Sequence, residues 1–84
     1  MKLVLYSTLG CHLCETAKAL LLELAQSGAP GLAQFSVTEV DIADDDTLFA
    51  RYGVRIPVLK IDDQNRELGW PFDLQQLYQF LSAN

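Results

Sequence analysis

The sequence predicts an α/β fold of order β-α-β-α-β-β-α, a four-stranded mixed sheet with helices on both faces. Three observations predict it: a short apolar run without alternation near the N-terminus, helical apolar spacing directly after it, and a second half whose apolar runs are separated by turn residues. Its 84 residues form one domain, 1–84, because compact domains have about 50 to 250 residues.

The first strand is predicted over residues 2–6, where a continuous apolar run is typical of a strand covered on both faces. Gly10 interrupts the chain, and a helix is predicted from about residue 12 to residue 27, ended by Gly28 and Pro30. Apolar residues at spacings of three and four form its expected buried side. These residues are Leu13, Ala17, Leu20, Leu21 and Leu24.

A β-rich stretch follows over residues 35–42, but its apolar residues change parity near Thr38. Either a bulge lies there or both faces of the strand are covered. One of the aspartates at 44–46 is expected to cap a short helix, and Gly53 suits a left-handed end for it. The side chains expected to anchor this helix are Leu48, Phe49 and Tyr52.

The second half is predicted to add a hairpin and a closing helix to the parallel strand pair formed by the first half. A strand region covers residues 54–61, a turn 62–65 and a brief strand 66–70. Asp73 is predicted to cap the last helix, Gln76 to reach back to it, and Phe72 to pack on Leu77. The apolar stripe of this helix is Leu74, Leu77, Tyr78 and Leu81.

The charge balance excludes several functions. Eleven acidic against six basic residues give a net charge of -5, the wrong sign for binding nucleic acid. The aspartates at 41 and 44–46 lack the alternating ligands and final glutamate of a calcium loop. The sequence lacks the basic start and apolar run of a secretory signal, and it has no apolar run of the roughly 20 residues that a membrane span needs. We therefore expect a cytoplasmic monomer with no membrane or nucleic-acid partner.

Chemistry is predicted at Cys11-His12-Leu13-Cys14, between the first strand and the first helix. Residues three apart on a helix have β-carbons about 5–6 Å apart, so modest adjustment closes a disulfide. Unpaired amides at the helix start favour a thiolate, which makes Cys11 the expected nucleophile and Cys14, with a higher pKa, the resolving cysteine. His12 adds charge beside Cys11 if protonated, but the helix end favours the neutral ring.

Two other interpretations of the cysteine pair are open. A structural zinc site needs two further Cys or His ligands, and the sequence offers only His12, so no metal is expected. Two inert buried cysteines would behave as small apolar residues. Their position after a strand and before a helix favours a redox pair instead.

Together the Cys11-x-x-Cys14 motif at this junction, the hairpin after Ile56-Pro57 and the closing helix resemble the glutaredoxin branch of the thioredoxin fold, nearly end to end. The resemblance implies a thioredoxin-like, glutaredoxin-type fold. It also implies that Pro57 is cis and lies against the cysteines, which leaves the backbone of Ile56 free to bind an extended substrate. A trans proline that only begins a strand is the alternative.

Some residues differ from the family pattern. Typical glutaredoxins have Pro-Tyr between the cysteines, where this chain has His12 and Leu13, and a lysine ahead of the motif, where this chain has Ser7-Thr8-Leu9-Gly10. The resemblance implies that His12 and Leu13 bind substrate, without the aromatic ring and the cation that would flank glutathione.

The family's Gly-Gly after the fourth strand is Gly69-Trp70-Pro71 in this chain. Asp73 matches the acidic position that holds the glutathione amine in the family, although it can equally be a plain helix cap. Trp70 and Phe72 either line the substrate groove or pack in the core.

These observations predict a small thiol-disulfide oxidoreductase, an enzyme in which Cys11 attacks a disulfide and Cys14 releases the reduced product. No bound cofactor is expected. The resemblance implies glutathione as reductant or co-substrate, and the partner is glutathione, a protein disulfide or a reductase. The alternative is a non-catalytic redox adaptor, or a metal or iron-sulfur carrier whose dimer supplies four thiolates. A purely structural protein is the third hypothesis.

Overall fold

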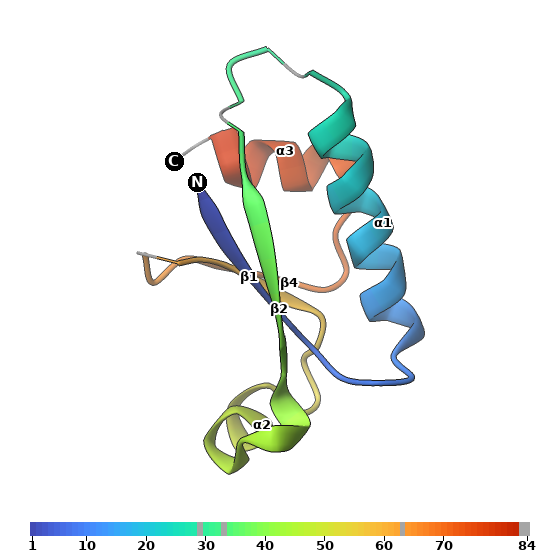
Figure 1. The fold of residues 1–84 in the computed structure, drawn as a ribbon, viewed down its shortest axis with the longest axis vertical. Coiled ribbons are helices and arrows are strands. Elements are labelled where there is room, and N and C mark those ends of the chain that lie inside the picture. The colour runs from blue at the N-terminus through green and yellow to red at the C-terminus, as the bar shows by residue number, and fades with distance from the viewer. Residues whose placement is uncertain (29, 33, 63, 83–84) are drawn as a thin grey trace.

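The computed structural model describes residues 1–28, 30–32, 34–62 and 64–82. Within these residues, four strands form one sheet in the order β2-β1-β3-β4, with helices at its faces and ends (Figure 1). The predicted order of elements is confirmed, with a short 3-10 helix added after β2. The elements are β1 (Lys2–Ser7), α1 (His12–Gln26), β2 (Ser36–Asp41), η1 (Ile42–Asp44), α2 (Asp46–Tyr52), β3 (Val58–Ile61), β4 (Glu67–Gly69) and α3 (Leu74–Ser82).

The edge strand β2 pairs with β1 in parallel without interruption, from Lys2 opposite Ser36 to Ser7 opposite Asp41. The continuous register shows that the bulge considered near Thr38 is wrong. The alternative, a strand covered on both faces, is also wrong, because residues 36–39 are all exposed. Ile42 departs from the parity of the strand because it is not in it: it begins η1 and is buried there, whereas Val40 lies in β2 and is half-buried.

The second half forms the predicted hairpin. β3 runs antiparallel to both β1 and β4. The chain reverses between β3 and β4, where the turn was predicted, and Asp63 of the predicted turn 62–65 lies outside the described residues. The expected strand over 54–61 begins only at Val58, because residues 53–55 form a turn after α2. The amides of Arg55 and Ile56 both donate to the carbonyl of Tyr52 there, at 2.8 and 3.1 Å.

The buried side of α1 matches the prediction except in the first turn of the helix. Cys14, Ala17, Leu21 and Leu24 form the buried stripe, and Leu20 is half-buried. Leu13 is 48% exposed, so its predicted place in the core is wrong. Because the helix begins at His12, Cys14 faces inward and Leu13, about 100° further round the helix, faces solvent.

Helices cover both faces of the sheet, as predicted. Successive side chains of a strand point to opposite faces. Leu3 and Leu5 of β1 face α1 and α3 in the larger cluster, while Tyr6 packs against a smaller one near α2. The larger cluster consists of Leu3, Leu5, Ala17, Leu21, Leu24, Leu59, Ile61, Phe72, Leu77 and Leu81. The smaller cluster consists of Ile42, Tyr52 and Val58.

The helix ends follow local chemistry. Asp45 caps α2, where its Oδ1 accepts the amides of Thr47 and Leu48 at 2.9 and 3.1 Å. Gly53 after α2 has φ -52°, so its predicted left-handed conformation is wrong. A β-carbon at Gly53 would lie 2.5 Å from the carbonyl oxygen of Phe49, which explains the glycine by close approach. Phe49 itself is 58% exposed and does not anchor α2.

At α3 the predicted capping box is present. Asp73 Oδ1 accepts the Gln76 amide at 2.8 Å, and Gln76 Oε1 accepts the Asp73 amide at 2.9 Å. Leu77 and Leu81 of the predicted stripe are buried, while Leu74 and Tyr78 pack half-buried against the larger cluster. None of the described helices is both long enough and apolar enough to cross a membrane.

Candidate functional site

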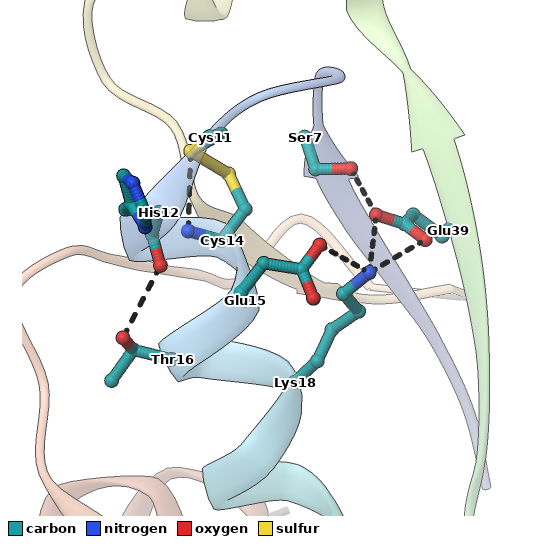
Figure 2. The surroundings of a disulfide bond; sticks show 8 residues. All are labelled: Ser7, Cys11, His12, Cys14, Glu15, Thr16, Lys18 and Glu39. Carbon is teal, nitrogen blue, oxygen red and sulfur yellow. Dashed lines mark hydrogen bonds and ion pairs between the residues drawn. A yellow bond between two sulfur atoms is a disulfide. The ribbon is translucent and has the colours of Figure 1, made fainter.

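The two cysteines meet at the start of α1, directly after the loop that leaves β1. Gly10 has φ +77°, a conformation that suits glycine and turns the chain into the helix. The Cα atoms of Cys11 and Cys14 are 5.2 Å apart and their sulfurs form a disulfide (Figure 2). The predicted disulfide reach is therefore confirmed, although the roles of the two cysteines stay predictions.

Cys11 is the N-cap of α1. Its backbone is extended, with φ -86° and ψ 104°, and its Sγ accepts the amide of Cys14 at 3.1 Å. Its carbonyl accepts the amide of Glu15 at 3.2 Å, and this hydrogen bond closes the first turn of the helix. Sulfur therefore occupies the place that a serine or aspartate oxygen normally takes at a helix start, at the positive end of the helix dipole.

The two sulfurs differ in exposure. Cys14 is 1% exposed and belongs to the buried side of α1, whereas Cys11 is partly exposed at the helix end. An incoming thiol or disulfide therefore has access to Cys11 before Cys14. This asymmetry is the arrangement expected of a nucleophile with a resolving partner behind it.

Both residues between the cysteines face solvent. His12 is exposed, and its carbonyl accepts the Thr16 hydroxyl at 3.2 Å. In Figure 2 the His12 ring lies on the opposite side of the disulfide from Glu39. Leu13 is exposed too, so both side chains are open to a partner at the disulfide. Their part in substrate binding stays a prediction.

The Ile56-Pro57 peptide bond is cis, as the family resemblance implies, and Pro57 is fully buried before β3. Ile56 packs half-buried against the smaller cluster. The Pro57 carbonyl accepts the amide of Trp70 at 3.1 Å. A second cis bond, Trp70-Pro71, was not predicted from the sequence. That Ile56 binds an extended substrate stays a prediction.

The aromatic pair near β4 belongs to the larger cluster. Phe72 is 4% exposed, and the Trp70 ring meets it edge-on with centroids 5.0 Å apart. Phe72 is therefore a core residue, the second of the two interpretations left open by the sequence. Trp70 is half-buried and packs against the same core.

A polar network beside the disulfide was missed in the sequence. The buried Ser7 hydroxyl donates to Glu39 Oε2 at 2.6 Å, and the Lys18 ammonium lies 2.9 Å from Glu15 and 3.4 Å from Glu39 (Figure 2). The hydrogen bond with Glu15 raises the pKa of Lys18. Parity was the available signal: Ser7 lies on the same face of β1 as Leu3 and Leu5.

This network lines a pocket of about 230 Å³ between the loop after β1, the first turns of α1 and the end of β2. Its lining residues are Ser7, Thr8, Leu9, Gly10, Glu15, Lys18, Glu39 and Asp41. Among the described residues, no three His, Cys, Asp or Glu side chains gather closely enough to hold a metal ion.

Comparison with known families decides the identity. A family model described as "Glutaredoxin-like domain (DUF836)" matches residues 2–82, almost the entire chain. The chain belongs to the glutaredoxin-like domain family. This glutaredoxin-like domain is thus a thioredoxin-fold redox protein, with its Cys11 and Cys14 sulfurs at disulfide distance. Among proteins with curated functions, none matches the sequence.

Solved structures agree with this assignment. The glutaredoxin-like domain is 43% identical to the Northeast Structural Genomics target XcR50 from X. campestris, covering 98% of this chain and 97% of that one, with a TM-score of 0.76. It is 32% identical to protein Ne2328 from Nitrosomonas europaea, covering 96% and 91%, with a TM-score of 0.77. Thioredoxin 1 from Thermosipho africanus, 14% identical over 99% and 92% with a TM-score of 0.66, shows the shared fold.

Proposed function

We propose that this glutaredoxin-like domain is a thiol-disulfide oxidoreductase with Cys11 as nucleophile and Cys14 as resolving cysteine. The Cys11 thiolate attacks one sulfur of a substrate disulfide, forms a mixed disulfide and releases the other substrate sulfur as a thiolate. Cys14 then loses its proton and attacks Cys11, which releases the second substrate sulfur. Two electrons pass to the substrate, whose two thiolates take up protons, and the Cys11–Cys14 disulfide remains.

The observation that carries the proposal is the hydrogen bond from the Cys14 amide to Cys11 Sγ at 3.1 Å, at the helix end. A donor aimed at sulfur stabilises a thiolate more than a thiol, so we expect a lowered pKa for reduced Cys11. Cys14 lacks this position and is buried, where desolvation disfavours its thiolate. The more nucleophilic sulfur is therefore also the more accessible one.

Glutathione is the proposed reductant of the oxidised pair. Two glutathione thiols would reduce Cys11–Cys14 and leave as glutathione disulfide, which balances the two electrons given to the substrate. Membership of the family supports this step, and Asp73 at the start of α3 is the residue proposed to hold the glutathione amine. Its Oδ1 atom also accepts the Gln76 amide, so one carboxylate would serve both the helix cap and the ligand.

Two single substitutions test the roles of the cysteines. Cys11→Ser should abolish reduction of any disulfide, because the attacking sulfur is gone. Cys14→Ser should still form a mixed disulfide with the substrate but accumulate it, since no resolving thiol follows. Mass spectrometry of the trapped adduct and turnover of a glutathionylated peptide measure the two effects.

Circular dichroism of both variants serves as the folding control. A folded Cys11→Ser variant that keeps most of the activity contradicts the proposal. If Cys14→Ser forms the adduct but glutathione cannot release its substrate, then glutathione is not the reductant and a dithiol mechanism remains.

A further inference from the structure

Two large apolar side chains near the Cys11–Cys14 disulfide are exposed to solvent. Leu9, two residues before Cys11, is 91% exposed, and Leu13, between the cysteines, is 48% exposed. Exposed single leucines are common on protein surfaces. These two, however, lie on either side of Cys11 in the chain, at the place where a substrate sulfur has to arrive. Whatever reaches Cys11 therefore comes close to apolar surface.

The pocket beside the disulfide adds negative charge to this surface. Of the described residues that line it, Glu15, Glu39 and Asp41 carry carboxylates and Lys18 carries the cation, which leaves an excess of two negative charges. Lys18 is already within ion-pair distance of Glu15 and Glu39. Leu9 also lines this pocket, so the exposed apolar side chain and the acidic pocket adjoin each other.

We propose that the disulfide substrate is a polypeptide segment whose cysteine is flanked by an apolar side chain and by a lysine or arginine. The apolar side chain covers Leu9 and Leu13, and the cation enters the acidic pocket. This assignment of the substrate class rests on the oxidoreductase function proposed above. Charge complementarity selects the cation, because the excess carboxylates of the pocket attract a cation and repel an anion.

The size of the pocket also favours a side chain over a whole small molecule. At about 230 Å³ it is smaller than the roughly 300–1,000 Å³ of pockets that enclose drug-sized ligands. It admits the end of one long side chain while the rest of the segment stays on the surface. Glutathione, with two carboxylates, is disfavoured as the donor of the substrate disulfide. As reductant it brings its thiolate to Cys11 and its amine to Asp73, which does not line this pocket.

Short peptides test the substrate class. Each peptide carries one cysteine linked by a disulfide to nitrothiobenzoate, which is coloured when it is released. On one side of the cysteine stands leucine or serine and on the other lysine or glutamate, which gives four peptides. The reduced protein should react about tenfold faster with the leucine-lysine peptide than with the leucine-glutamate peptide at low salt. The ratio should shrink towards one at about 1 M salt, where the screening length is about 3 Å.

Surface variants locate the selectivity. Leu9→Ser and Leu13→Ser should each lower the rate ratio between leucine and serine peptides several-fold, because the leucine of the peptide then buries less apolar surface against the protein. Leu22→Ser is the matched control, since Leu22 is 59% exposed on α1 and does not line this pocket. It should leave the ratio unchanged.

Charge variants locate the cation. Asp41→Asn keeps a side-chain oxygen that can accept the Ala43 amide, as Asp41 Oδ1 does at 2.9 Å, but removes one charge from the pocket. The preference for lysine over glutamate peptides should fall several-fold. Glu23→Gln changes the net charge equally outside the pocket and should have little effect.

A small neutral disulfide, hydroxyethyl disulfide, separates this inference from the proposed function. If the wild-type protein reduces it no faster than free cysteine does, the oxidoreductase proposal itself is wrong. If the protein reduces it rapidly but all four peptides react at one rate, only the docking inference is overturned. A preference for the glutamate peptides likewise overturns it.

Discussion

The two faces of the sheet are covered by different means. On one face α1 and α3 pack over a cluster that holds ten of the buried residues in the described part of the chain. On the other face, next to α2, the corresponding cluster holds three. Apolar burial scales with the area removed from water, so the first face supplies most of the stability that holds α1 and its cysteines in place.

Polar and aromatic contacts supplement the smaller cluster. The ring of Tyr52 stacks on Tyr6 with centroids 4.3 Å apart, and its hydroxyl donates to Glu67. Arg55 Nη2 lies 3.5 Å from the same carboxylate. Ile56, which precedes Pro57, packs on this cluster. The cysteine pair is thus held mainly by apolar burial, whereas polar and aromatic contacts help to fix the cluster on which Ile56 packs.

Removing equal side chains from the two clusters gives the largest expected effect. Leu77→Ala in the larger cluster should cost about 3–5 kcal/mol of unfolding free energy, because the surrounding residues cannot collapse into the cavity. Ile42→Ala in the smaller one should cost about 2 kcal/mol, since a small cluster relaxes more easily. Both side chains are buried to 1% or less exposure, and urea unfolding measures the costs.

The exposed Leu22 provides the control, and Leu22→Ala should change the free energy by less than about 0.5 kcal/mol. Equal costs at Leu77 and Ile42 would show that the two faces contribute alike, and a larger cost at Ile42 would reverse the comparison.

The second prediction concerns the hydrogen bond of the smaller face. Tyr52→Phe should cost about 1–2 kcal/mol, because the partly buried Glu67 loses a donor. Tyr78→Phe is the matched control: its hydroxyl donates to the Pro30 carbonyl at 2.7 Å in an exposed setting and should cost less.

The same tyrosine makes stability depend on pH. Burial, with the hydrogen bond to Glu67 and its charge, raises the pKa of Tyr52 from 10.0 to about 12. The contribution is complete below pH 10, and it is lost between pH 10 and 12 as the unfolded chain ionises first. Tyr52→Phe should flatten that part of the curve, whereas an unchanged slope would mean that other groups cause it.

Features that depend on near neighbours could be predicted from the sequence. The Asp73 and Gln76 capping box, the cap of α2 and the reach between Cys11 and Cys14 each involve residues within three positions of each other. Their geometry follows from the helix alone. The chemical centre of the site, the cysteine pair, could therefore be predicted from the sequence.

Features that depend on strand register could not be predicted in the same way. Ser7 and Glu39 are 32 positions apart, and their contact exists because β1 and β2 pair with Leu5 opposite Glu39. The exposure of Leu13 depends on where α1 begins, and a shift of one residue turns a side chain about 100° round the helix. The acidic pocket follows from that register and was therefore not seen in the sequence.

The smallest expected change in stability comes from Asp73, which precedes α3, and it separates two roles of this residue. Asp73→Ala should cost about 1 kcal/mol, because α3 loses the acceptor for the Gln76 amide, whereas Asp73→Asn should cost only a few tenths, since asparagine caps equally well. If Asp73 also holds the glutathione amine, both variants should raise the KM for glutathione, because both lose the charge. If KM stays constant in Asp73→Asn, the residue is a helix cap alone, and the charge needed to bind glutathione lies elsewhere or is not used.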